Sequence, residues 1–136
     1  MSLKKATLLG LISAIFSILL SLLFNQIYSK GLDVDFSKVL TYTGIVIANL
    51  IGCFLMAIGY YIIIKFDRLR LLGFFNILIV IVSFISIIGV FGFQLPMEIE
   101  YPELFPGLAI PMHFFPCISY LSLIPFFKKK NYGILN

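Results

Sequence analysis

Four uninterrupted apolar runs constrain this chain more than any other feature of its sequence. None of them contains Asp, Glu, Lys or Arg, and each is longer than twenty residues. An α-helix rises about 1.5 Å per residue, so each run is long enough to cross a hydrocarbon core of about 30 Å. The runs cover residues 6–28, 39–64, 71–93 and 104–127.

The runs predict helices, because backbone polar groups in lipid must bond within their own segment unless a barrel closes. A barrel needs alternating segments of about ten residues, whereas these runs are continuous. Hydrophobic residues make up 61% of the chain and charged residues 12%, about half the charged share of soluble domains. We predict one integral membrane domain over residues 1–136: an all-α, four-helix transmembrane bundle with antiparallel neighbours, surrounded by the lipid bilayer.

The charged residues indicate an orientation. One side of the predicted bundle carries Asp67 and most of the basic residues, namely Lys4, Lys5, Lys65, Arg68, Arg70, Lys128, Lys129 and Lys130. The other side carries Lys30 and Lys38 with the remaining acidic residues, Asp33, Asp35, Glu98, Glu100 and Glu103. The positive-inside rule then predicts a bacterial-type plasma membrane protein with both termini in the cytoplasm. The short basic triplet at 128–130 predicts no nucleic-acid partner.

Small residues recur at helical spacing in two of the runs. Lipid tails are as apolar as leucine, so helices associate in lipid where small residues let their backbones approach. We therefore predict that both stripes are buried packing seams of the bundle. The alternative is that one stripe contacts a second copy of the chain or another membrane protein. The stripes are Gly10, Ala14, Ser17 and Ser21 in the first run, and Gly44, Ala48 and Gly52 in the second.

The fourth run contains four prolines and the only histidine of the chain. Prolines at 111, 116 and 125 each remove one helical hydrogen bond, which predicts a kinked fourth helix. His113 and Cys117 are four residues apart, as are Asn49 and Cys53 in the second run, and residues so spaced share a helix face. Counted from the outer ends of their runs, the two pairs lie at about the same depth.

We expect Asn49, Cys53, His113 and Cys117 to converge if the second and fourth helices touch. An ionisable residue inside a bilayer suggests a functional pocket. The alternative is structural: a neutral imidazole that bonds to Asn49 or to a carbonyl freed by proline. One histidine and two cysteines lack a recognisable ligand spacing, so we predict no metal site and no cofactor.

The outer loop at 94–103 alternates in character. Leu95, Met97, Ile99 and Tyr101 would face one way in an extended segment, opposite a set formed by Pro96, Glu98, Glu100 and Pro102. Such a strip is suited to cover the outer mouth of the bundle as a lid, where Glu98, Glu100 and Glu103 would attract a cation. The simpler interpretation is that these carboxylates are solvated charges that follow the topology.

The stretch "ANLIGCFLMAIG", residues 48–59, resembles the second helix of the small four-helix fluoride channels. In that family the matching asparagine lines the pore, and here it is Asn49. The family's Thr- and Phe-rich break in the third helix and the Gly/Arg signature of its first helix are missing. We interpret the resemblance as convergence on a packing helix with one polar group.

Three functional classes remain open. The first is binding or transport of a small ligand in an intramembrane pocket near Asn49 and His113. The second is a structural or assembly subunit that contacts another membrane protein through its small-residue faces. The third is an intramembrane enzyme that uses His113, although the runs contain no carboxylate to partner it and we predict no catalytic set.

Overall fold

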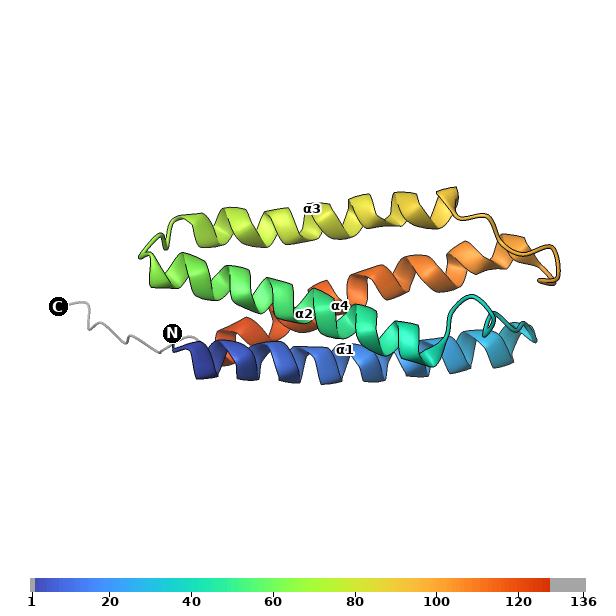
Figure 1. The fold of residues 1–136 in the computed structure, drawn as a ribbon, viewed down its shortest axis with the longest axis horizontal. Helices are drawn as coiled ribbons and strands as arrows, with labels where there is room; N and C mark the ends of the chain where they lie inside the picture. The colour runs from blue at the N-terminus through green and yellow to red at the C-terminus, as the bar shows by residue number, and fades with distance from the viewer. Residues whose placement is uncertain (1, 128–136) are drawn as a thin grey trace.

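The computed structural model describes residues 2–127, and within them it is all-helical, as predicted. Four α-helices lie side by side (Figure 1): α1 (Leu3–Leu32), α2 (Tyr42–Lys65), α3 (Leu71–Gly92) and α4 (Phe105–Phe127). A short 3₁₀ helix, η1 (Pro102–Leu104), precedes α4. Each of the four α-helices is long and apolar enough to cross a membrane.

Hydroxyl side chains begin the first two helices. Ser2 accepts a hydrogen bond from the backbone N–H of Lys5 and Thr41 accepts one from Gly44, so each satisfies a donor that a helix start leaves free. At the other end of α1, Asp33 adopts a left-handed conformation (φ 53°), and its N–H and that of Val34 bond to the Ser29 carbonyl. The helix therefore ends within a single residue.

Helices α1 and α2 make the most extensive pairing in the bundle. The seam of α1 lies inside it: Gly10, Ala14, Ser17 and Ser21 are all buried. A Cβ atom added to Gly10 would lie 3.1 Å from Cβ of Ala57 and 3.2 Å from the ring of Phe54, which is tighter than ordinary contact. The absent side chain at position 10 therefore sets how closely these two helices approach.

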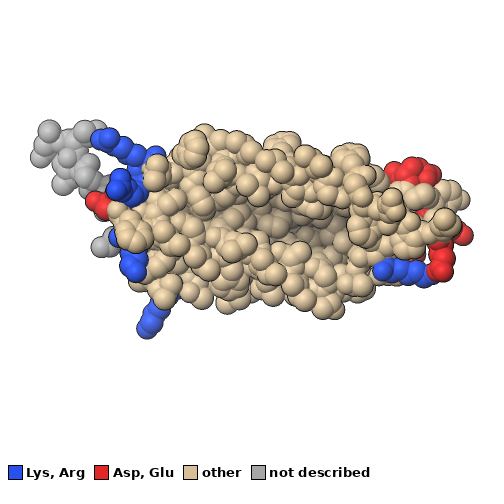
Figure 2. Space-filling view, turned by 45° about the horizontal axis from the view of Figure 1, so that its top comes forward, with Lys and Arg blue, Asp and Glu red and all other residues tan. Residues whose placement is uncertain are grey.

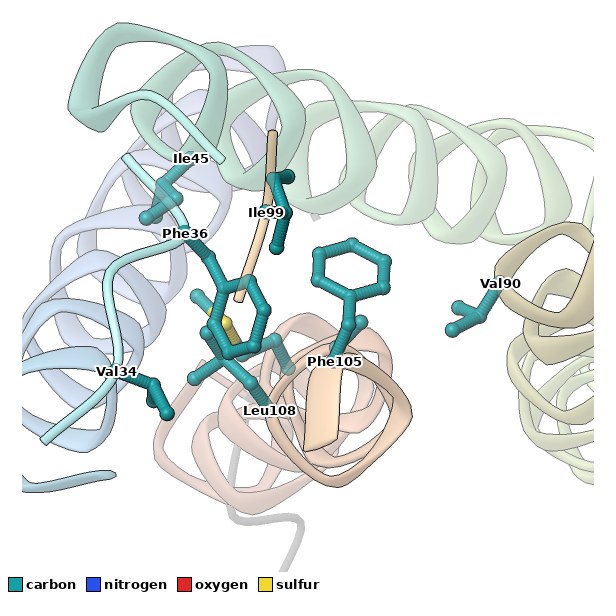
Figure 3. Packing of buried hydrophobic residues seen from close by; sticks show 9 residues of the cluster. Val34, Phe36, Ile45, Val90, Ile99, Phe105 and Leu108 are labelled. Carbon is teal, nitrogen blue, oxygen red and sulfur yellow. The ribbon is translucent and has the colours of Figure 1, made fainter. Parts of the chain in front are cut away.

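The two longer connections, 33–41 and 93–104, pack together at one end of the bundle. Figure 3 shows Phe36 reaching from the first connection toward Phe105 and Leu108 of α4, with Ile99 above it. The rings of Phe36 and Phe105 meet edge to face, 5.5 Å between centroids. Lys38 and Glu98 join the same two connections by an ion pair of 2.8 Å. That pair is largely exposed, so the apolar contacts contribute more to this end.

Hydrogen bonds also order these connections. The backbone N–H of Ser37 donates to the Asp35 carboxylate at 2.8 Å and lowers the pKa of that carboxyl group. The Tyr28 hydroxyl of α1 donates to the Leu104 carbonyl at 2.8 Å, and its ring lies where Gly107 has no side chain. The C-terminal end of α1 is thus joined directly to the start of α4.

Segment 94–103 does not keep the extended alternation that its sequence suggests. A turn links the Ile99 N–H to the Pro96 carbonyl, and Tyr101 is left-handed at φ 55°. Ile99 is buried in the core, whereas Met97 and Tyr101, expected on the same face, are exposed. Proline at 96 favours a turn over a continued strand, and the reversal breaks the two-residue period.

The charged side chains gather mainly at the two ends of the molecule (Figure 2), with a long uncharged surface between them. Lys and Arg predominate at one end, and Asp and Glu at the other. The basic residues Lys128, Lys129 and Lys130 lie outside the described residues. This arrangement leaves uncharged the part of the surface that a hydrocarbon layer would cover.

We predict that Gly10→Leu lowers the free energy of unfolding by about 1 to 3 kcal/mol, because the new side chain meets Ala57 and Phe54. Gly73→Leu is the matched control, since a Cβ there meets nothing within 4 Å. It should change stability by less than about 0.5 kcal/mol. Unfolding in mixed detergent micelles would measure both, and equal losses would show that the α1–α2 contact does not depend on Gly10.

Candidate functional site

A cleft of about 510 Å³ lies between α2, α3 and α4. Figure 2 shows it as a hollow in the middle of the uncharged surface. Among the residues that line it are Asn49 on α2, Ser83 and Ser86 on α3, and His113 and Cys117 on α4. None of its lining residues is Asp, Glu, Lys or Arg, so any ligand here meets a lining without formal charge.

The stripe of small residues on α2 forms one wall of this cleft. Gly44 and Ala48 are exposed there, and a Cβ added to Gly52 would only meet Pro116 at an ordinary 3.5 Å. This corrects the expectation that Gly44, Ala48 and Gly52 form a buried packing seam. Small residues permit another helix to approach but do not attract one, and here no helix fills the space that they leave.

The position of α3 explains why the cleft stays open. Helix α3 packs mainly against α4 and only slightly against α2. Phe84 of α3 and Phe114 of α4 stack edge to face with centroids 4.9 Å apart. Against α2, the ring of Phe75 covers Gly59, where an added Cβ would come within 2.5 Å of it. These aromatic contacts hold α3 beside α4, away from the small-residue wall of α2.

Asn49 is buried, and the bonds of its amide run to α1 and to its own helix. Its Nδ2 donates to the Ile45 carbonyl at 2.7 Å and to Ser21 Oγ at 3.3 Å. Its Oδ1 accepts a hydrogen bond from Ser17 Oγ. Both ends of the amide are therefore satisfied, and Asn49 joins α2 to the serines of α1 while it also contributes to the cleft lining.

His113 is half-buried on the cleft wall. Its Nδ1 lies 2.8 Å from the carbonyl oxygen of Ala109, one helical turn earlier. A carbonyl only accepts, so Nδ1 carries the proton, and in the neutral ring Nε2 is then a free acceptor. The partner is neither Asn49 nor one of the carbonyls that the prolines release. Within residues 2–127, no hydrogen bond to Nε2 is formed.

The two cysteines occupy different places. Cys117 lines the cleft, whereas Cys53 is fully buried behind it, with its Sγ 3.9 Å from the Pro116 carbonyl. Of the four residues expected to converge, Asn49, His113 and Cys117 share the cleft lining and Cys53 does not. Residues 2–127 contain no group of three or more His, Cys, Asp and Glu side chains placed to hold a metal.

The acidic residues of the outer loop lie apart from this cleft. Glu98 pairs with Lys38, and Glu100 and Glu103 are exposed to solvent. None of the three lines the cleft. That these carboxylates attract a cation stays a prediction. In the structure, Glu98 instead joins the connections 33–41 and 93–104 through its ion pair with Lys38.

Two features were not anticipated from the sequence. Ser83 and Ser86 line the cleft, although both hydroxyls bond within α3, to the carbonyls of Ile79 and Ser83. Tyr60 and Tyr120 form a buried edge-to-face pair whose hydroxyls have no hydrogen-bond partner among the described residues. Tyr60 lies five residues from the end of α2, so its position suggests an interfacial tyrosine and gives no sign of burial.

Comparisons with protein-family models, with curated proteins and with solved structures found no match to this chain. The assignment of the candidate site therefore rests on its geometry alone.

We predict that Ser17 and Asn49 are energetically coupled. A double-mutant cycle with Ser17→Ala and Asn49→Ala should give a coupling energy of about 0.6 to 1.7 kcal/mol, the range found for hydrogen bonds between membrane helices. The same cycle with Ser83→Ala in place of Ser17→Ala should give almost none, because the Ser83 hydroxyl bonds to Ile79 of its own helix. Equal coupling in both cycles would contradict the assignment.

Proposed function

We propose that this protein spans a membrane four times and binds a small ligand inside the bilayer, in the cleft between α2, α3 and α4. The observation that carries the proposal is one open cleft lined by Asn49, His113 and Cys117, on a molecule whose middle surface is uncharged. Binding pockets typically have apolar walls and a few placed polar groups. Here the free polar group is His113, since the Asn49 amide is satisfied by α1 and by its own helix.

The proposal includes a topology in which successive helices alternate in direction and both termini are cytoplasmic. The ion pair between Lys38 and Glu98 supports it, because it brings the first and third connections to the same end. The basic residues of the described chain support it through the positive-inside rule, which favours a cytoplasmic position for Lys4, Lys5 and the 65–70 connection. A bacterial-type plasma membrane fits this pattern.

We further propose that α4 bends at its internal prolines. Pro111, Pro116 and Pro125 all lie inside this helix, and each removes a donor from the hydrogen-bond ladder. A bend near Pro111 and Pro116 would tilt the His113 face into the cleft. A change in that bend would open or narrow the cleft, since Pro116 itself contributes to the lining.

The topology predicts how single cysteines will label. Ser37→Cys should react with a membrane-impermeant maleimide on intact cells, and Asp67→Cys should react only after permeabilisation. The native residues Cys53 and Cys117 are buried, so the background should be low. Labelling of both introduced cysteines from outside would contradict the proposed topology.

Ligand binding predicts a molecule that copurifies with the protein. Organic extracts of purified wild-type protein, analysed by mass spectrometry, should contain it in near-stoichiometric amount. His113→Ala should weaken binding about tenfold, the effect of one hydrogen bond of about 1.4 kcal/mol, and so lower the extracted amount. Ala48→Trp should remove it by filling the cleft, whereas Ile51→Trp, on the exposed face of α2, should retain it. Identical extracts from all four proteins would refute the proposal.

A second candidate function is assembly with another membrane protein through α3. Only Ile79 and Val90 of this helix are buried, and an added Cβ at Gly73, Gly89 or Gly92 would meet nothing within 4 Å. Its outward face is thus free for another helix. Gly89→Leu should abolish such an assembly in cross-linking experiments while the extract of copurifying molecules stays unchanged, which separates the two functions.

A further inference from the structure

The dimensions of the cleft restrict what can occupy it. Its α2 wall extends from Gly44 to Met56, twelve residues apart, which corresponds to about 18 Å along a helix. The 510 Å³ open to the centres of water-sized molecules, spread over about 18 Å, gives a width of about 6 Å for those centres and so of about 9 Å from wall to wall. An α-helix with side chains is about 10 to 12 Å across, so a whole partner helix does not fit. One hydrocarbon chain, with van der Waals contact distances of about 4 Å, does.

The charge of the lining restricts the occupant further. Because no lining residue carries a formal charge, the cleft is complementary to an uncharged ligand. The O–H groups of Ser83 and Ser86 donate within α3, although their oxygens can still accept, and the Asn49 amide is used by α1 and α2. His113 Nε2 remains as an acceptor, and an acceptor complements a ligand that carries one hydrogen-bond donor.

The opening of the cleft indicates the route of entry. Gly44 and Ala48 are exposed on its α2 side, and Leu78 and Val82 are exposed on its α3 side. Ala48, Leu78 and Val82 lie inside membrane-length helices, and Gly44 lies in the first turn of α2. A ligand that enters between α2 and α3 therefore comes sideways from the lipid rather than from water.

We infer that the occupant is a single-chain, uncharged amphiphile of the bilayer, a long-chain alcohol or amide. Its chain lies along the small-residue wall of α2, and its O–H or N–H donates to His113 Nε2. This inference rests on the proposed function and specifies its ligand class. Pro116 faces Gly52, so His113, three residues before it, lies near the middle of this wall, and the chain follows about 10 Å of the wall before it extends into the lipid.

The test uses the full-length protein in lipid nanodiscs and a hexadecanol probe that carries a photoreactive diazirine. Saturable cross-links should map to cleft residues of α2, α3 and α4. Unlabelled hexadecanol should compete about tenfold better than hexadecyl methyl ether, which has the same chain but no donor. His113→Ala should remove that preference, and Ala48→Trp should remove the saturable labelling that Ile51→Trp retains.

Several outcomes would overturn the inference. Labelling that does not saturate, spread over all lipid-facing residues, would show that no chain site exists. Equal competition by the alcohol and the ether would show that His113 accepts no hydrogen bond from the ligand. A dimer that shields the cleft from the probe would show that a second copy occupies it. If wild-type extracts contain a compact molecule that hexadecanol fails to displace, the inferred ligand class is wrong while the proposed function stands. If the extracts contain no copurifying molecule, both the inference and the proposed function are wrong.

Discussion

The fold depends on how closely two helices approach in a medium that gives them no hydrophobic reason to associate. Lipid tails and leucine side chains are equally apolar, so association relies on packing and on hydrogen bonds between helices. The pairing of α1 with α2 has both. Gly10 and Ala14 bring the backbones together, and Ser17 and Ser21 then reach Asn49 across the gap. A bulkier residue at either glycine or alanine would separate the partners of these bonds.

The cleft follows from the same physics. Helix α3 has no comparable seam against α2, and its contacts are aromatic rings that fix it next to α4 and over Gly59. A helix held by a few rings leaves space wherever its neighbour has small residues. Gly44, Ala48 and Gly52 are such residues, so the wall of α2 stays uncovered. Small residues at helical spacing thus allow close contact between α1 and α2 but leave a hollow between α2 and α3.

Sequence alone predicted the helices well, because the absence of charge over twenty residues leaves few other structures possible in lipid. It did not predict the partner of Asn49. Both Asn49 and the serines of α1 were recognised, but equal depth suggested a pairing with His113, and depth does not determine which face of a helix points where. It predicted a pocket near Asn49 and His113 but took the α2 stripe of small residues for a buried seam, since a spacing of four describes packing seams and empty walls equally. In segment 94–103, the turn after Pro96 broke an alternation that the residues themselves display.

The length of α1 determines which bilayer thickness suits this protein. Its thirty residues measure about 45 Å, whereas the 22 residues of α3 measure about 33 Å. Tilt alone would have to exceed the usual range to fit α1 into a 30 Å core, so its ends extend into the headgroup layers on both faces. The hydrogen bond between Tyr28 and Leu104 then lies near the headgroups at one face. A change in bilayer thickness therefore affects the two helices unequally. A thicker membrane strains the shorter α3 first, and α3 forms one wall of the cleft.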